Sequence, residues 1–285
     1  MTKVRAVIAL KADHQLETLL EIAGLARSTF FYHQARVDRE DPRAELKTAI
    51  RAAFHANKGR YGYRRVHAVL RNAGWQIAKK TVLKLMRALD VNCHVRRRRR
   101  YVSYRGKVGK VAPNLLQRDF EASAPNQKWA TDVTEFRVGE RKLYLSPIMD
   151  LFDRQILSYS LGISPTVEYT CSPLRAALTT LEPGERPVVH SDQGFQDQHT
   201  TWQRLLKESR AKQSMSRKGN CLDNAVIESF FGHLKEELFH HTTFLSIEAL
   251  DVAIRDYIHW YNHERITTKH KGLSPVQYRA QALAA

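Results

Sequence analysis

The second half of the chain alternates between short strand-like runs and helical runs, and this order constrains the fold most. Three strand-like runs come first, at residues 128–138, 142–152 and 155–161, with the tight connections typical of an antiparallel meander. Later runs cover residues 167–181, 187–191, 198–209, 211–215, 223–238 and 247–263. The resulting order β-β-β-α-β-α-β-α predicts a mixed α/β fold, with a five-stranded sheet and helices on both faces.

Three acidic residues occupy notable positions in this pattern. Asp132 lies within the first strand-like run, and Asp192 ends a β-branched run just before Gly194, where the chain can turn away. Glu228 lies one turn into an amphipathic helix, and 35 residues separate it from Asp192. Taken singly, each acid has a structural reading as a turn, cap or paired residue. Taken together, they predict a site at the ends of separate elements, where α/β folds usually place chemistry.

Carboxylate oxygens of this kind favour Mg²⁺ or Mn²⁺ as ligands. Two such ions can activate water and stabilise an alkoxide leaving group in phosphodiester chemistry. Lys235 lies seven residues after Glu228 and therefore returns to nearly the same helical face. An acid and a lysine on one face would suit a metal and a phosphate together.

The net charge of +17 is concentrated in one segment. Residues 46–110 contain 19 basic residues and one acid, Asp90, whereas the segments on either side are close to neutral. A block of like charge repels itself unless a polyanion neutralises it, so the predicted partner is nucleic acid. A solvated face or an acidic protein partner is the alternative reading.

Two helix-turn-helix patterns precede the α/β half. The first lies in residues 1–36, where Gly24 separates two helical runs; an ordinary helical hairpin is its alternative. The second follows the linker 37–42, and its two apolar stripes flank Gly74 and carry many basic residues. Residues 96–110 start with five arginines and predict an extended tether along a phosphate backbone.

These patterns predict four parts: a helix-turn-helix at 1–40, a second, basic one at 41–95, a basic linker at 96–122, and a catalytic core with C-terminal helices at 123–285. The residues expected to contact DNA are Arg27, Ser28, Arg60, Arg64, Arg65, Lys79, Lys80, Lys84, Arg96, Arg97, Arg98, Arg99, Arg100, Lys218 and Lys235.

Cysteine usage and hydropathy indicate the compartment. The three cysteines are far apart and form no CxxC pair, which argues against a disulfide framework and favours a reducing cytoplasm. No apolar run approaches the ~20 residues of a membrane span, so no membrane association is expected.

Several long motifs, in order along the chain, resemble the OrfB transposases of the insertion-sequence-3 type, whose core is similar to retroviral integrases. The motifs are YGYRRV, WATDVTEF, LYLSPIMDLFDR, HSDQG, SMSRKGNCLDNAVIESFFGHLKEE and YNHER with KGLSPVQY. The resemblance covers nearly the whole chain. It implies an RNase H-like core, and a D,D,E catalytic triad matched here by Asp132, Asp192 and Glu228.

The same resemblance implies two Mg²⁺ ions and a DNA transposase activity. Such an enzyme cleaves DNA at the terminal inverted repeats to free a 3′-OH, which attacks another phosphodiester without a covalent enzyme–DNA intermediate. Transposition would follow a copy-out–paste-in route. Lys235 matches a basic residue that contacts terminal DNA.

The implied partners are double-stranded DNA, both terminal repeats and target, and an OrfA protein or an OrfA–OrfB fusion. Because two DNA ends each need an active site, we expect at least a homodimer on DNA. The expected location is the bacterial cytoplasm, with nucleoid association when DNA is bound.

Two other functions remain open on the sequence. One is a DNA-binding regulator derived from a transposase with an inactive core, which would bind the repeats without nicking them. The other is an RNase H-like structure-specific nuclease, which would cut without end-sequence preference and would not join strands.

Overall fold

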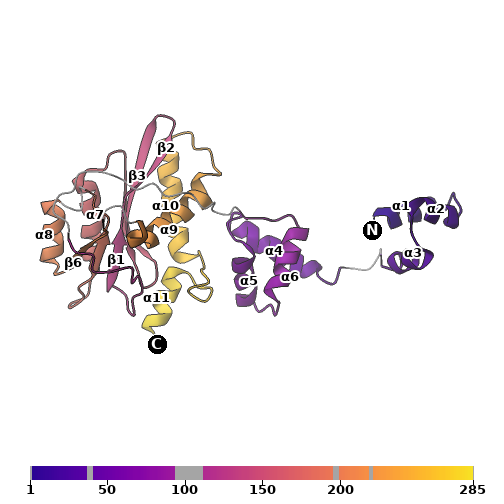
Figure 1. Ribbon diagram of the computed structural model, residues 1–285, viewed down its shortest axis with the longest axis horizontal. Helices are drawn as coiled ribbons and strands as arrows, with labels where there is room; N and C mark the ends of the chain where they lie inside the picture. Colours follow the sequence, from indigo (N-terminus) through magenta and orange to yellow (C-terminus); the bar gives the residue numbers. More distant parts are fainter. Residues whose placement is uncertain (1, 37–40, 94–111, 195–198, 218–220, 285) are drawn as a thin grey trace. The chain divides into compact units, whose positions relative to one another are not determined.

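The computed structural model describes residues 2–36, 41–93, 112–194, 199–217 and 221–284 (Figure 1). Backbone contacts divide the chain into two units, Met1–Ala53 and Phe54–Ala285. The four-part division predicted from sequence stays a prediction. None of the described helices is long and apolar enough to cross a membrane.

The first unit contains three short helices: α1 (Thr2–Leu10), α2 (Leu16–Ala23) and α3 (Arg27–Gln34). Their buried side chains are Val4, Val7, Leu19, Leu20 and Phe30. Gly24 ends α2 with φ of 59°, a left-handed conformation that glycine adopts at little cost. The predicted arrangement of helix, glycine turn and helix is therefore present.

Helix α4 (Ala44–Ala56) spans the division between the units, and two further helices open the second unit. They are α5 (Tyr63–Asn72) and α6 (Lys79–Ala88). Val66 and Leu70 are buried on α5, as are Val82, Leu85 and Met86 on α6. These residues belong to the apolar stripes that the sequence predicts.

The sheet follows. In the described part of the chain it has six strands: β1 (Lys128–Thr131), β2 (Thr134–Val138), β3 (Arg141–Asp150), β4 (Ile156–Gly162), β5 (Val188–Ser191) and β6 (Lys212–Met215). Strand β3 pairs antiparallel with β4 on one edge and with both β1 and β2 on the other. Strand β5 lies parallel between β1 and β6. The mixed sheet confirms the predicted fold class.

The predicted count of five strands differs from the observed six because the first strand-like run is interrupted at Asp132 and Val133. Strands β1 and β2 keep one continuous register against β3, which places Asp132 opposite Pro147. Just after β3, Leu151 donates its N–H to the Lys128 carbonyl. In an antiparallel pair every second residue makes hydrogen bonds to the same neighbouring strand, so Met149 and Pro147 point their backbone groups toward β1 and its continuation as well. Pro147 therefore stands where an N–H would donate to Asp132, and proline has none.

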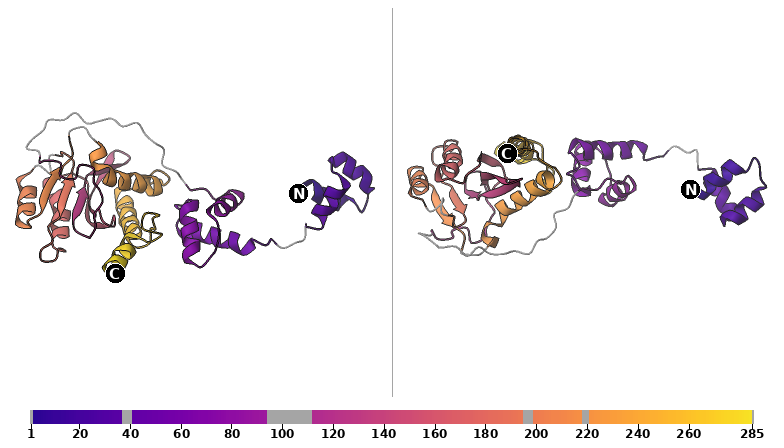
Figure 2. Two further views of the ribbon diagram at one scale, coloured as in Figure 1. Left: turned by 60° about the horizontal axis from the view of Figure 1, so that its bottom comes forward. Right: turned by 90° about the horizontal axis from the view of Figure 1, so that it is seen from above.

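Helices cover both faces of the sheet. On one face lie α7 (Val167–Leu178) and α8 (Thr200–Glu208), and on the other α9 (Ala225–Leu234) and α10 (Ile247–His263), a division visible in Figures 1 and 2. The short turns η1 (Cys221–Asn224, 3₁₀) and η2 (Lys235–Phe239, π) flank α9, and α11 (Pro275–Leu283) follows α10.

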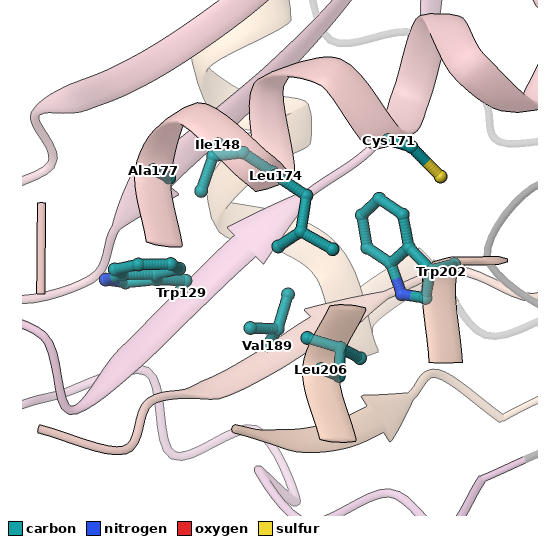
Figure 3. Packing of buried hydrophobic residues seen from close by; sticks show 8 residues of the cluster. All are labelled: Trp129, Ile148, Cys171, Leu174, Ala177, Val189, Trp202 and Leu206. Atoms are coloured by element: carbon teal, nitrogen blue, oxygen red, sulfur yellow. The ribbon is translucent and has the colours of Figure 1, made fainter. Parts of the chain in front are cut away.

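The core under α7 and α8 is apolar and densely filled. Figure 3 shows Trp129, Ile148 and Val189 projecting from the strands toward the two helices. Leu174 and Ala177 of α7 meet them, as do Trp202 and Leu206 of α8. Because Trp129 faces this side, the alternation along an extended strand directs Ala130 and Asp132 toward the opposite face.

The C-terminal helix is attached through a buried charge cluster. Asp150, the last residue of β3, and Asp153, in the turn before β4, are fully buried, and Arg279 of α11 pairs with both carboxylates. Burial, and then the charge of Asp153, raise the pKa of Asp150 to about 6. Arg279 therefore compensates two acids that would repel each other in its absence.

We expect Arg279→Met to lower the free energy of unfolding by about 3–5 kcal/mol at pH 8, since it leaves buried carboxylates unpaired. Because Arg279 lowers the pKa of Asp150, its removal should raise that pKa above about 6, so the loss should shrink as the pH falls from 8 toward 6 and then level off. Urea denaturation at several pH values measures both effects. Arg175→Met is the control, because its partner Glu168 and Arg175 itself are at least half exposed, and it should cost less than about 1 kcal/mol. Equal losses in the two variants would contradict this assignment.

Candidate active site

Asp132 lies in the interruption between β1 and β2. Its Oδ1 accepts the backbone N–H of Val133 at 2.7 Å, which satisfies a donor left without a ladder partner. The side chain is half-buried. The interruption thus turns a strand residue into one whose carboxylate is held at a fixed point beside the sheet.

Asp192 directly follows β5, the parallel neighbour of β1. The register pairs Ala130 with His190, so the same offset carried two residues further places Asp192 beside Asp132. Oδ1 of Asp192 accepts the N–H of Gly194 at 2.7 Å, and Gln193 donates to the Ser216 carbonyl at 2.9 Å. The parallel pairing of β1 with β5 brings both acids to one edge of the sheet, although the sequence predicts only Asp192 at a strand end and Asp132 within a strand.

Glu228 lies in the first turn of α9. Buried Ile227, Phe231 and Leu234 anchor this helix, as their spacing predicts. Asn224, just before the helix, is buried and donates to the Thr131 carbonyl at 3.2 Å. This hydrogen bond joins the start of α9 to the end of β1, next to Asp132, and the sequence pattern did not single it out.

Electrostatic interactions connect the predicted site residues. The pKa of Asp132 is raised well above its usual range, first by desolvation and then by the charges of Asp192 and Glu228. The Val133 N–H and the Lys235 ammonium act in the opposite direction. The Lys235 Nζ also lies 5.3 Å from the centre of the Phe136 ring on β2. The three acids and Lys235 are therefore neighbours around the end of β1.

The donor set fits a divalent cation. The charges of Asp192 and Glu228 raise the pKa of Asp132, and carboxylate oxygens are the ligands that Mg²⁺ and Mn²⁺ prefer. Among the residues that the structure describes, no three acids, histidines or cysteines stand close enough together to form a closed coordination set.

Comparisons with known proteins place this geometry in context. The family described as Integrase core domain matches residues 122–221 and 228–283, and the HTH-like domain family matches residues 41–100. InsK of Escherichia coli K12, assigned as the transposase of insertion sequence element IS150, is 50% identical over 272 residues, which cover 95% of this chain and 96% of InsK. Transposase InsF for IS3A, also of Escherichia coli K12, is 35% identical over 279 residues, 96% of this chain and 97% of InsF.

The chain belongs to the IS3-type transposases. It is accordingly an enzyme of the polynucleotidyl transferase class, with an integrase core. Among solved structures it is similar to a simian T-cell lymphotropic virus intasome, at 19% identity and a TM-score of 0.46 over 71% of this chain and 67% of that chain. It is also similar to the HTLV-2 integrase catalytic core domain in complex with magnesium, at 20% identity and a TM-score of 0.40 over 55% of this chain and 98% of that chain.

A further buried acid lies in the turn η1, directly before the helix that carries Glu228. Asp223, in η1, accepts hydrogen bonds from Arg217, Arg118 and Asn114, and the hydrogen bond from Arg217 lowers the pKa of this carboxyl despite burial. These bonds tie the chain before β1 to the turn that leads into α9. The sequence pattern did not single out Asp223, because two of its three partners, Asn114 and Arg118, lie more than a hundred residues upstream.

The predicted DNA contacts fall into four groups. Arg27 and Ser28 are exposed at the start of α3, and Arg64, Lys79, Lys80 and Lys84 are exposed on α5 and α6. Arg60 and Arg65 point into the protein instead, against the region around Glu237. Lys235 lies at the end of α9, by the acids. Arg96, Arg97, Arg98, Arg99, Arg100 and Lys218 lie outside the described residues.

We expect Asp132→Asn to stabilise the metal-free transposase by about 0.5–2 kcal/mol at pH 7, because it removes a desolvated charge from a repelling cluster. Because the pKa is raised on folding, this penalty is absent below the unfolded value of about 3.8 and grows as pH rises through the folded value. The gain should therefore disappear in acid. Mg²⁺ should raise the melting temperature of the unsubstituted protein but not that of the variant.

Thermal melts with and without Mg²⁺ measure these effects. Asp119→Asn is the control, since Lys128 lowers the pKa of that exposed carboxyl and the substitution should not stabilise the fold. A destabilised Asp132→Asn protein, or an equal Mg²⁺ response in both proteins, would contradict the charge-cluster interpretation.

Proposed function

We propose that this transposase binds the terminal inverted repeats of an insertion sequence, cleaves DNA there to expose a 3′-OH, and transfers that end to a second phosphodiester. Asp132, Asp192 and Glu228 are the proposed catalytic triad. The observation that carries the proposal is the position of these acids around the end of β1: Asp132 and Asp192 follow the paired parallel strands β1 and β5, and the Asn224 hydrogen bond to the Thr131 carbonyl joins the start of the Glu228 helix to β1. Their elements are far apart in sequence, and the fold alone brings them together.

In this proposal the three carboxylates hold two Mg²⁺ ions, for which Mn²⁺ can substitute. When bound, such ions neutralise charge on the attacking and leaving oxygens of an in-line displacement. The chain's own contribution is placement: Asp132 is fixed by the Val133 N–H, Asp192 by the Gly194 N–H, and Glu228 by the buried stripe of α9. Lys235, on the same helical face as Glu228, holds a phosphate of the terminal DNA.

The exposed basic residues of α5 and α6 are proposed to follow the DNA backbone, and Arg27 and Ser28 of α3 to make a second contact. Substrates are the double-stranded terminal repeats and a target duplex. Two ends require two active sites, so the working form is at least a homodimer, joined by an OrfA protein or formed as an OrfA–OrfB fusion. The alternative, a DNA-binding regulator with an inactive core, predicts the same repeat binding without nicking.

Glu228→Gln tests the triad. Its rate of Mg²⁺-dependent cleavage of a repeat-ended duplex should fall at least about 100-fold, because a neutral amide neither holds the ions nor balances their charge. Its repeat binding should stay within a few-fold of the unsubstituted protein. Gel-based cleavage and fluorescence anisotropy measure the two quantities.

Glu140→Gln, in the exposed turn between β2 and β3, is the matched control and should cleave normally. Normal cleavage by Glu228→Gln would falsify the triad. Repeat binding with no metal-dependent cleavage by the unsubstituted protein would favour the regulator, and cleavage without end preference or joining would favour a structure-specific nuclease.

The basic helices are tested by salt dependence. Lys80→Met and Lys84→Met should each weaken DNA binding for all sequences alike, and each should reduce the slope of log affinity against log salt by about 1. Arg60→Met should instead lower the melting temperature, since its guanidinium lies 4.6 Å from the centre of the Trp260 ring. A reduced slope for Arg60→Met with an unchanged melting temperature would reverse this assignment.

A further inference from the structure

The helix that carries Glu228 and Lys235 continues into the π-helical turn η2, and Glu237 lies in that turn. Glu237 is the buried end of a network of charges. Its Oε1 accepts from Arg265 Nη2 at 2.7 Å and from Arg65 Nη1 at 3.0 Å, and its Oε2 accepts from Arg265 Nε at 2.8 Å and from the Tyr257 hydroxyl at 2.8 Å. The carboxylate side chain is 8% exposed.

Most of these partners belong to the C-terminal part of the core. Tyr257 lies on α10, and Arg265, 3% exposed, follows it. Burial alone would raise the pKa of Glu237, but the charge and hydrogen bonds of Arg265, with Arg65, lower it to about 2. Glu237 is therefore ionised and fully engaged at neutral pH.

Arg65 is different, because it comes from helix α5, among the basic helices. Two further contacts join the same region to the core. The Arg60 Nε donates to the backbone carbonyl of Glu237 at 3.1 Å, and the buried Tyr61 hydroxyl accepts the Ile266 N–H at 2.9 Å. The chain at the start of α5 is thus bonded to the same turn that ends the helix of Glu228.

We propose that Glu237 is a positioning residue that fixes the basic helices α5 and α6 to the helix bearing Glu228 and Lys235. DNA held by the basic helices then presents one particular phosphodiester to the acids. This inference rests on the proposed function, which supplies the cleavage reaction. We call the contacts of Glu237 with Arg60 and Arg65 the joint, and the proposal assigns both arginines to it rather than to DNA contact. Weakening the joint should make the position of the cleaved phosphodiester less specific while the rate of metal-dependent nicking is retained.

Glu237→Gln and Arg65→Met test the joint, and Glu236→Gln is the matched control. Glu236 is the neighbouring acid in the same turn, and its Oε1 lies 3.0 Å from the His241 ring. Arg65→Met leaves the pairing of Glu237 with Arg265 in place, so it keeps the test valid if Glu237→Gln does not fold. Three quantities are measured with the full chain: repeat binding, metal-dependent nicking of supercoiled plasmid without repeats, and cleavage of a repeat-ended duplex mapped to the nucleotide.

Both test variants should retain repeat binding and plasmid nicking within about 3-fold. Cleavage at the correct end should fall about 10-fold or more, and cuts should spread to adjacent phosphodiesters. Glu236→Gln should behave as the unsubstituted protein. Correct-end cleavage that is unchanged in both variants would overturn the proposal, as would a parallel loss of nicking and end cleavage, which a role in folding alone would produce.

Hydrogen exchange separates failure of the joint from failure of the proposed function. If the unsubstituted protein cleaves nothing, the proposed function fails, and exchange then decides the joint. Repeat DNA should slow exchange in residues 225–239 of the unsubstituted protein and of Glu236→Gln, and should not do so in Arg65→Met. Equal protection in Arg65→Met, or no protection in any protein, would overturn the joint.

Discussion

The parallel pairing of β1 with β5 is the constraint on which the candidate site depends. It brings Asp132 and Asp192, sixty positions apart in sequence, to one edge of the sheet. Side-by-side parallel strands need a long crossover between them, and here that crossover comprises β2, β3, β4 and α7. The apolar cluster of Trp129, Ile148 and Val189 under α7 and α8 holds this pairing in place. This packed core keeps β1 and β5 paired although the two carboxylates repel each other.

Bringing these acids together costs free energy through charge repulsion, which the packing of the rest of the fold offsets. Elsewhere the buried acids are compensated: Asp150 and Asp153 by Arg279, Asp223 by Arg217, and Glu237 by Arg265. Around Asp132 the balance is different, because two acids raise its pKa and they are opposed by the Val133 N–H and by the charge of Lys235. A region short of positive charge within a strongly basic protein is what a cation-dependent site requires before its cations bind.

The sequence was informative wherever a local rule decides the outcome. Apolar spacing located the helices and most strands, Gly24 marked the turn between α2 and α3, and the position of Asp192 after a β-branched run placed it at the sheet edge. The interruption of the first strand was not predicted, because it depends on Pro147, which faces Asp132 only once β3 has folded back. Whether Asp132, Asp192 and Glu228 act as a triad remains a prediction.

Charge was the less reliable guide to individual side chains. The basic block indicated helices whose exposed residues include Lys80 and Lys84, whereas Arg60 and Arg65, which it also predicts to contact DNA, form hydrogen bonds with Glu237. Their partner, Glu237, lies more than 170 residues away. No local pattern distinguishes an arginine that pairs with a distant buried acid from one that faces solvent.

The π-helical turn has a consequence for how this protein can vary. Lys235 reaches toward Phe136 and the acids, while Glu237, two residues on, reaches toward α5 and α10. Two residues along a helix point to nearly opposite faces. The same turn therefore directs Lys235 toward the acids and Glu237 toward the contacts with α5 and α10. Adding or removing a single residue between Glu228 and Glu237 would rotate one face out of place by about 100°. The length of this segment is therefore fixed independently of the identity of most of its residues.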